Sequence, residues 1–399
     1  MSESRVSAIE TSHHTSAWPF VLAVFAFSRL LFLGTGAVAA TALPWAEPIA
    51  SVLGPPDSNY WAHWDGAWYS EIAIYGYDYL APMSTPFFPL FPMLLRVGTA
   101  LGGGPALWGV LISLVATPFA MYFLYRVAEK LQGVKIARIA VLAFAFFPTA
   151  FFLNAVYTEA LFLAFTTGSF WAGFVRRDLL LAGLLGALAA ATRNLGVLLL
   201  IPLAYEWLRN RQEFGRRGVW EMALVPAGLL GYMMFLWYRF GDPLLFANAQ
   251  ATLWRRELID PVTALGMAWA KAGEGLGHFL DPATLFLDPQ GGRAVLEAYN
   301  TMSFAFLVLL LVLGGIGFRV LPPGLSVYNF LITLLPVLTP NPAIPLMGLP
   351  RYALGAFPLF LILGHLLSRS RPALYLWFLV SVGLGIVFTA LFVTWRWMV

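Results

Sequence analysis

The chain of 399 residues is 60% hydrophobic and 11% charged, whereas about 25% of the residues in soluble domains are charged. This composition predicts an integral membrane protein and excludes a large soluble core. The net charge of +4 comes without a basic cluster interleaved with aromatic residues, so nucleic acid is not expected as a partner. Cysteine is absent, which excludes a disulfide framework, a thiol nucleophile and a thiolate metal site.

The first apolar segment covers residues 17–43. It has one feature of a signal peptide, because Val38-Ala39-Ala40 resembles a cleavage site. A cleaved signal normally has a shorter, uncharged apolar core, and this segment is long and contains Arg29. We therefore expect a retained transmembrane helix.

The segment from His63 to Tyr77 places a carboxylate among aromatic residues, just after the first span. Wound as a helix at 100° per residue, it puts Asp65 on one face with Trp64 and Trp68 and turns His63 to the opposite face. Placing a charge on such an apolar face costs free energy, and charges in such positions more often have a function than not. Asp65 is therefore the leading candidate for chemistry, while His63 is either a solvent-facing interfacial residue or a substrate contact.

Further spans of about 20 apolar residues are expected along the rest of the chain. They lie near 105–125, 136–155, 158–175, 219–239, 300–318, 324–339, 352–367 and 373–394. The apolar segment 179–207 is too long for one ordinary helix and is interrupted at Arg193.

The positions of basic residues indicate how segment 179–207 crosses the membrane, because cytoplasmic loops collect Lys and Arg. Basic clusters occur at 126–138, 176–177, 209–217 and 369–371. Two short crossings that meet at Arg193 put all four clusters on one side, whereas a single crossing would put the third cluster outside. We predict two short helices there, about 11 spans in total and a cytoplasmic N-terminus. The chain 1–399 would then form one membrane domain with outer segments 44–100 and 241–298.

Tyr157 and Glu159 lie in a short turn that this topology places on the same side as Asp65. Glu159 stands in the first turn of the next helix, where a carboxylate complements the helix dipole. The alternative is that Tyr157 and Glu159 add a hydroxyl and a second carboxylate to the site of Asp65.

Several arginines are candidates for an anion. A guanidinium at membrane depth needs an anion or carbonyl groups, so Arg193 either pairs with a buried acid or binds a lipid phosphate. The second reading is favoured because no acid is adjacent to it in sequence. Arg351 either snorkels to the interface or is a second phosphate ligand, and Arg255 and Arg256 are further candidates for headgroup or substrate contacts.

Metal and nucleotide motifs are absent from the sequence. There is no HExxH, no cluster of histidines, no dense run of aspartates and no Walker-type GxxxxGK[ST]. No cofactor is expected, and the outer carboxylates leave a labile divalent cation as an open alternative.

Taken in order, the motifs resemble the PIG-V family of mannosyltransferases, including its prokaryotic members. The matching motifs are His63-Trp64-Asp65 through Gly76-Tyr77, Phe87-Phe88-Pro89-Leu90-Phe91-Pro92, Tyr157-Thr158-Glu159-Ala160-Leu161-Phe162 and Ala191-Thr192-Arg193-Asn194-Leu195-Gly196. Gly241-Asp242-Pro243 and Arg351-Tyr352 fit the prokaryotic pattern. The chain departs from the family at His63, where Arg is frequent, and in segment 193–196, where Arg-Ser-Asn-Gly is usual.

The resemblance implies a GT-C fold, which is an all-α polytopic membrane protein with interfacial helices on its outer side. It implies an inverting transfer of a hexose, with mannose expected, from a polyprenyl-phosphate donor in the bilayer to a glycan or glycolipid acceptor. The family's catalytic acid in the first outer loop corresponds to Asp65, and the active site would face the exterior or periplasm of a prokaryotic plasma membrane. Substrate contacts are expected from His63, Trp64, Tyr69, Tyr157, Glu159, Arg193, Asn194, Arg255, Arg351 and Tyr352.

A secondary transporter or a flippase for lipid-linked sugars is the rival class. Transporters bind anions at interrupted helices, and the break at Arg193 fits that pattern. Against a transporter, the sequence shows no matching broken span in its other half, and the notable acids lie in outer segments. An inactive relative that holds partners in an assembly is a third class, which the intact Asp65 disfavours.

Overall fold

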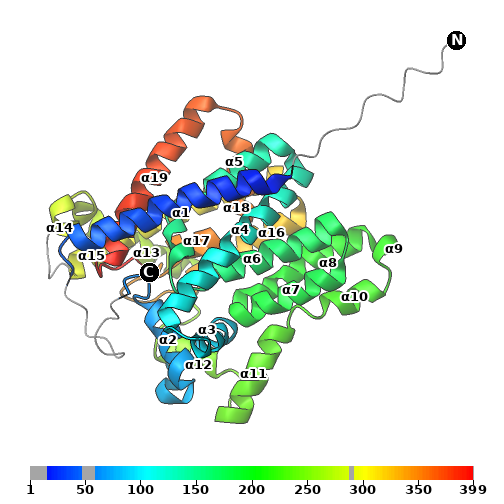
Figure 1. Cartoon of the computed structure of the whole chain (residues 1–399), viewed down its shortest axis with the longest axis horizontal. Helices are drawn as coiled ribbons and strands as arrows, with labels where there is room; N and C mark the ends of the chain where they lie inside the picture. The colour runs from blue at the N-terminus through cyan, green and yellow to red at the C-terminus, as the bar shows by residue number, and fades with distance from the viewer. Residues whose placement is uncertain (1–15, 47–58, 287–291, 399) are drawn as a thin grey trace.

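The computed structural model describes residues 16–46, 59–286 and 292–398, and parts of both outer segments, 47–58 and 287–291, lie outside them. Within the described ranges the chain is helical and contains no strand, which confirms the predicted all-α fold (Figure 1). The α-helices are α1 (Ala17–Ala42), α2 (Asp65–Tyr75), α3 (Leu90–Ala100), α4 (Pro105–Gln132), α5 (Val134–Ala145), α6 (Glu159–Phe170), α7 (Leu179–Thr192), α8 (Leu200–Arg209), α9 (Arg211–Phe214), α10 (Arg217–Met222), α11 (Ala227–Phe240), α12 (Leu245–Thr252), α13 (Pro261–Phe279), α14 (Pro282–Phe286), α15 (Gly292–Val320), α16 (Pro323–Val337), α17 (Leu349–Gly355), α18 (Pro358–Leu367) and α19 (Arg371–Val393). The short helices of other types are η1 (Asp78–Leu80), η2 (Ala150–Asn154), η3 (Trp171–Arg176) and η4 (Asn194–Leu199).

Among the described residues, four helices are long and apolar enough to cross a membrane: α1, α4, residues 293–320 of α15, and α19. The bent pair α17–α18 adds a fifth span if it is counted as one, and the chain is an integral membrane protein. The predicted span 324–339 forms the single, shorter helix α16. The remaining predicted spans are divided into shorter helices, and proline gives the physical reason at two of the breaks. Pro226 precedes α11 and Pro358 begins α18. The count of about 11 spans stays a prediction.

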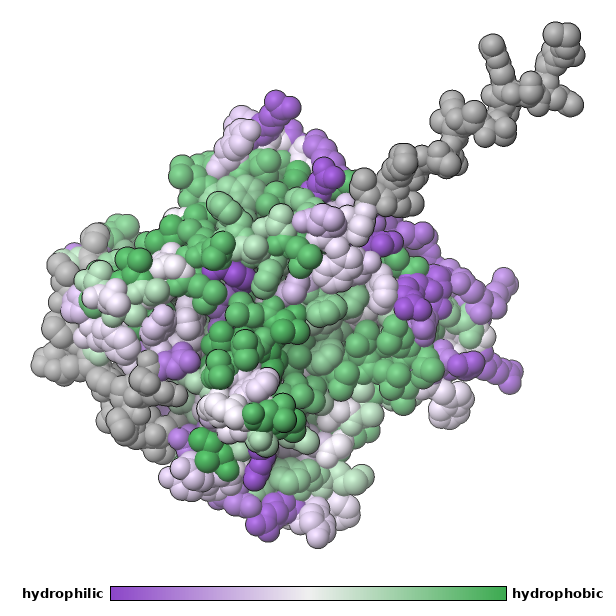
Figure 2. All heavy atoms as spheres, in the orientation of Figure 1, coloured by the Kyte–Doolittle hydropathy of each residue, from purple (hydrophilic) through white to green (hydrophobic). Residues whose placement is uncertain are grey.

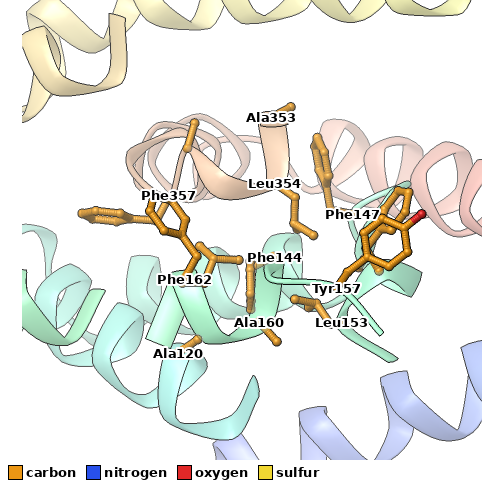
Figure 3. Close-up of a cluster of buried hydrophobic side chains, with 14 of the residues drawn as sticks. Ala120, Phe144, Phe147, Leu153, Tyr157, Ala160, Phe162, Ala353, Leu354 and Phe357 are labelled. Carbon is orange, nitrogen blue, oxygen red and sulfur yellow. The ribbon is translucent and has the colours of Figure 1, made fainter. Parts of the chain in front are cut away.

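The helices pack into one bundle. α4 lies against α5 and α6, α6 against α7, α5 against α18, and α1 against α19. Figure 3 shows part of the core, where Phe162 of α6 and Phe357 at the α17–α18 junction lie on one side of the cluster and Tyr157 lies at the other side. Figure 2 shows hydrophobic side chains across the middle of one face and hydrophilic ones at its margins, as expected for a protein surrounded by lipid.

Segment 179–207 folds back on itself, as the distribution of basic residues predicted. The α-helical pattern ends at Arg193, whose backbone is extended, and η4 packs back against α7, while α8 reaches η3 just before α7. Arg177, just before α7, forms ion pairs with Glu206 of α8 and Glu213 of α9, so both ends of the segment lie together. Gly196 permits the tight return, because a Cβ there would lie 2.4 Å from the backbone nitrogen of Ala190.

Arg29 ties α1 to the bundle. Its guanidinium is buried and donates to the carbonyl oxygens of Ala145 (3.1 Å) and Ala150 (2.8 Å) and to Asn154 Oδ1 (3.0 Å). The Ala145 carbonyl closes α5 and has no partner inside that helix, as at any helix end. The charge that argued against a signal peptide is therefore accommodated by packing inside the fold.

Replacing Arg29 should destabilise the fold. R29M removes the donors and leaves buried carbonyl groups unpaired, which we expect to cost about 1–3 kcal/mol of unfolding free energy. Arg319, in the last turn of α15, is exposed, so the matched variant R319M should change that free energy by less than about 0.5 kcal/mol. Thermal unfolding of both variants in detergent gives the comparison, and equal melting temperatures would contradict this role of Arg29.

Candidate active site

A cavity of about 540 Å³ lies between α2, the turn of the 179–207 hairpin, the segment after α12, and α17. In Figure 1, α2, α3 and α12 lie together in the lower part of the view, away from α8, α9 and α10 at the right margin. The polar lining of the cavity includes Asp65, Tyr69, Arg193, Asn194, Arg256, Arg351 and Tyr352. All seven were candidates from the sequence, although Arg256 was named only together with its neighbour Arg255.

Asp65 is the first residue of α2, because the helix does not extend upstream as predicted. Trp64 has a φ of 56°, a left-handed value that interrupts regular winding just before Asp65. The hydroxyl of Tyr157 fixes this junction: it accepts from the Asp65 backbone N–H at 3.2 Å and donates to the His63 carbonyl at 3.0 Å. Tyr157 therefore sets the position of Asp65 without lining the cavity.

Four charged side chains form a continuous network beside the cavity. Arg351 Nη1 lies 2.5 Å from Asp65 Oδ2, and Arg351 Nε lies 3.4 Å from Glu159 Oε1. Arg193 Nη2 lies 2.9 Å from the same Glu159 oxygen. The Glu159 side chain is 0% exposed, whereas that of Asp65 is 21% exposed.

This network corrects two sequence arguments. Asp65 was expected to be a charge stranded on an aromatic face, but it contacts a guanidinium at the edge of a cavity. Arg193 was assigned to a lipid phosphate because no acid is adjacent to it in sequence. The structure supplies an acid through tertiary packing, since Glu159 begins α6. The alternative of a structural pair with a buried acid is therefore the one observed.

Of the two adjacent arginine candidates, Arg256 lines the cavity and Arg255 does not. Arg256 Nε donates to the Thr339 carbonyl at 3.1 Å, and its Nη1 donates to the Tyr352 hydroxyl at 3.4 Å. Arg255 is exposed, with a φ of 54°, and does not line the cavity. The two arginines are adjacent in a non-helical segment, so no periodicity in the sequence could distinguish them.

His63 and Trp64 lie behind the site. The His63 side chain is only 1% exposed and stacks on Trp395 at a centroid distance of 4.2 Å, so the solvent-facing alternative is wrong. The Trp64 ring packs edge-on against Trp397, 4.7 Å between centroids, and Trp397 lines the cavity. Sequence analysis missed these C-terminal tryptophans, because nothing local to them signals a contact with residues so far away in the chain.

Tyr69 faces the cavity from the second turn of α2. Burial raises the pKa of its hydroxyl above the ordinary value, so the hydroxyl stays protonated and is able to donate a hydrogen bond.

Among the described residues, no group of three His, Asp and Glu side chains could hold a metal ion. Asp65 and Glu159 each contact a guanidinium instead.

Several solved structures show weak similarity that extends over most of the chain. A crystal structure of the Archaeoglobus fulgidus oligosaccharyltransferase with Zn and sulfate aligns at 13% identity and a TM-score of 0.44, covering 94% of this chain and 53% of that one. ArnT from Cupriavidus metallidurans, bound to undecaprenyl phosphate, aligns at 15% identity and a TM-score of 0.34, covering 90% and 79%. The chain thus spans about half the length of the oligosaccharyltransferase, and no curated protein matches it in sequence.

The family comparison gives a defined match. The family model described as Mannosyltransferase (PIG-V) matches residues 51–209, a range that contains Asp65, Tyr157, Glu159 and Arg193. All four motifs that carry the resemblance contribute residues to the cavity or to its charge network. The predicted resemblance is confirmed: over residues 51–209 the chain is similar to the PIG-V mannosyltransferase family, a family of glycosyltransferases.

Proposed function

We propose that the chain transfers a hexose, with mannose as the family name suggests, from a polyprenyl-phosphate donor to a hydroxyl group of a glycan or glycolipid. The observation that carries this proposal is the position of Asp65 in a cavity lined also by guanidinium groups, inside the range of the family match. A carboxylate suits activation of a hydroxyl, and guanidinium groups suit a departing phosphate.

Asp65 is the proposed general base. Arg351 holds its Oδ2, which leaves Oδ1 to accept the proton of the acceptor hydroxyl. The hydroxyl oxygen then forms a bond to the anomeric carbon while the bond from that carbon to the phosphate oxygen breaks. The electron pair leaves with the phosphate, and attack from the opposite face inverts the anomeric carbon.

The apolar part of the cavity suits a lipid donor. Phe87, Phe88, Phe246, Trp254 and Leu335 line it together with the charged residues. A prenyl chain is able to stay against such a wall while its phosphate remains among the polar groups.

The basic clusters support an outward-facing site. Lys135 donates to the Ser368 carbonyl at 2.8 Å, which joins the first and last clusters at one end of the bundle. Arg177 pairs with Glu206 and Glu213 at the base of the hairpin, whereas Arg193 lies at its turn beside the cavity. If Lys and Arg mark the cytoplasmic side, the cavity opens on the outer side.

One sequence argument against the rival transporter fails. In the later half of the chain, α17 and α18 meet at 82°, a bend that a broken span or a re-entrant loop has, so the absence of a second interrupted helix no longer argues against a transporter. The family match and the carboxylate in the cavity now carry the preference for an enzyme. Purified protein in detergent separates the two classes, since an enzyme converts a polyprenyl-phosphate sugar without any gradient.

Removing the charge of Asp65 should abolish sugar transfer. D65N keeps the side-chain volume and removes the proton acceptor, so we expect turnover to fall by about 10²–10⁴-fold. Asp78, in the same outer segment, is 55% exposed and pairs with Arg239, which makes D78N the matched control with near-normal turnover. Binding of a prenyl phosphate should survive in both variants. Near-normal turnover of D65N would refute the base assignment.

The pair Arg193–Glu159 should show strong energetic coupling. R193Q leaves the fully buried Glu159 with only its longer contact to Arg351, so we expect a loss of about 3–5 kcal/mol in unfolding free energy. The double variant E159Q/R193Q removes the stranded charge and should recover part of that loss. A double-mutant cycle measured by unfolding in detergent gives the coupling energy, and strictly additive effects would show that the pair is not structural.

A further inference from the structure

We propose that Arg256 binds the phosphate group of the lipid donor, the role that sequence analysis gave to Arg193 and Arg351. This inference deepens the proposed function and rests on it for the identity of the donor. It depends on the charge balance of the cavity, on the contacts of Arg256 and on the residues that flank it.

Three guanidinium groups line the cavity, and two of them are already neutralised. Arg351 contacts Asp65 and Glu159, and Arg193 contacts Glu159. Three positive and two negative side chains leave one surplus positive charge. A partly buried surplus charge is costly unless an anion compensates it.

Arg256 carries this surplus charge. In the described part of the chain, no carboxylate lies within ion-pair distance of its guanidinium, and its polar contacts are all to neutral groups. They are the Thr339 carbonyl and hydroxyl, the Pro336 carbonyl and the Tyr352 hydroxyl, at 3.1–3.5 Å. A guanidinium has five N–H donors, and only Nε makes a contact shorter than 3.4 Å, so the Nη groups are available to an anion.

Two hydrogen bonds to the segment after α16 fix the position of the segment that holds Arg256. Asn341 Nδ2 donates to the Trp254 carbonyl at 3.0 Å, and the Ile259 backbone N–H donates to the Leu338 carbonyl at 3.0 Å. Arg256 is thus set against the C-terminal end of α16, whereas the adjacent Arg255 of the same segment is exposed.

The location fits a phosphate on a lipid chain next to the reacting carbon. Tyr352 lies between Arg256 and the charge network, with its ring 5.3 Å from the Arg351 guanidinium carbon and 5.4 Å from that of Arg193. On its other side, Arg256 shares the cavity with the apolar rings of Trp254 and Phe246. A phosphate attached to a prenyl chain fits both parts of the cavity, because the phosphate contacts the guanidinium group and the chain contacts the apolar rings. A free phosphate has no group for the apolar rings.

The test compares R256Q with R255Q, which removes the same charge from the adjacent, exposed position. Binding of decaprenyl phosphate, decaprenol and inorganic phosphate to the purified full chain in detergent is measured by tryptophan fluorescence, with R256K as the conservative variant. Because a charge-assisted hydrogen bond contributes about 1.5–3 kcal/mol, we expect R256Q to weaken decaprenyl phosphate binding by about 10–100-fold. R255Q should bind like the wild type, R256K should fall between, and decaprenol should bind all four proteins alike.

Equal binding of decaprenyl phosphate by R256Q and R255Q would overturn the inference. Inorganic phosphate that binds the wild type as tightly as decaprenyl phosphate would overturn the lipid source of the anion. A wild type that binds decaprenyl phosphate through Arg256 but transfers no sugar would refute the proposed function and leave the phosphate site standing. Melting temperatures of the variants, with partial rescue by R256K, distinguish lost binding from lost folding.

Discussion

The burial of Glu159 is the constraint on which the rest of the site depends. A fully buried carboxylate in a membrane protein is tolerated only if cations compensate it, and here Arg193 and Arg351 converge on one of its oxygens. The start of α6, the turn of the 179–207 hairpin and α17 must therefore meet at one point. Arg351 then extends the network to Asp65, which places the proposed base at the edge of the cavity.

The site divides into two sides with different electrostatics. On one side, Asp65 is oriented by Arg351 and by the Tyr157 hydroxyl at the start of α2. On the other side, Arg256 brings positive charge that no described carboxylate balances, next to an apolar wall. Tyr352 lies between the two sides. The proposed inverting displacement uses them separately, with the acceptor hydroxyl beside Asp65 and the lipid phosphate beside Arg256.

Sequence analysis predicted the features that depend on local signals. Basic clusters at both ends of segment 179–207 predicted the hairpin. This signal is local, because Lys and Arg beside each apolar segment indicate which of its ends is cytoplasmic. Three kinds of error arose from interactions that are not local. The left-handed φ of Trp64 makes α2 begin later than predicted. The C-terminal Trp395 stacks on His63 and shields it from solvent. Tertiary packing brings Glu159 to Arg193. The distinction between Arg255 and Arg256 was equally out of reach, since it depends on which one faces α16.

The most direct test of the account is a transfer assay with purified protein in detergent, without any membrane or gradient. The protein is given a polyprenyl-phosphate mannose and a glycolipid extract as the source of acceptors, and mass spectrometry follows both substrates. The account predicts release of polyprenyl phosphate together with a glycolipid enlarged by one hexose, and loss of both products with D65N. A donor that remains intact, while the same protein moves it across the bilayer of a vesicle, would contradict the account and establish the transporter.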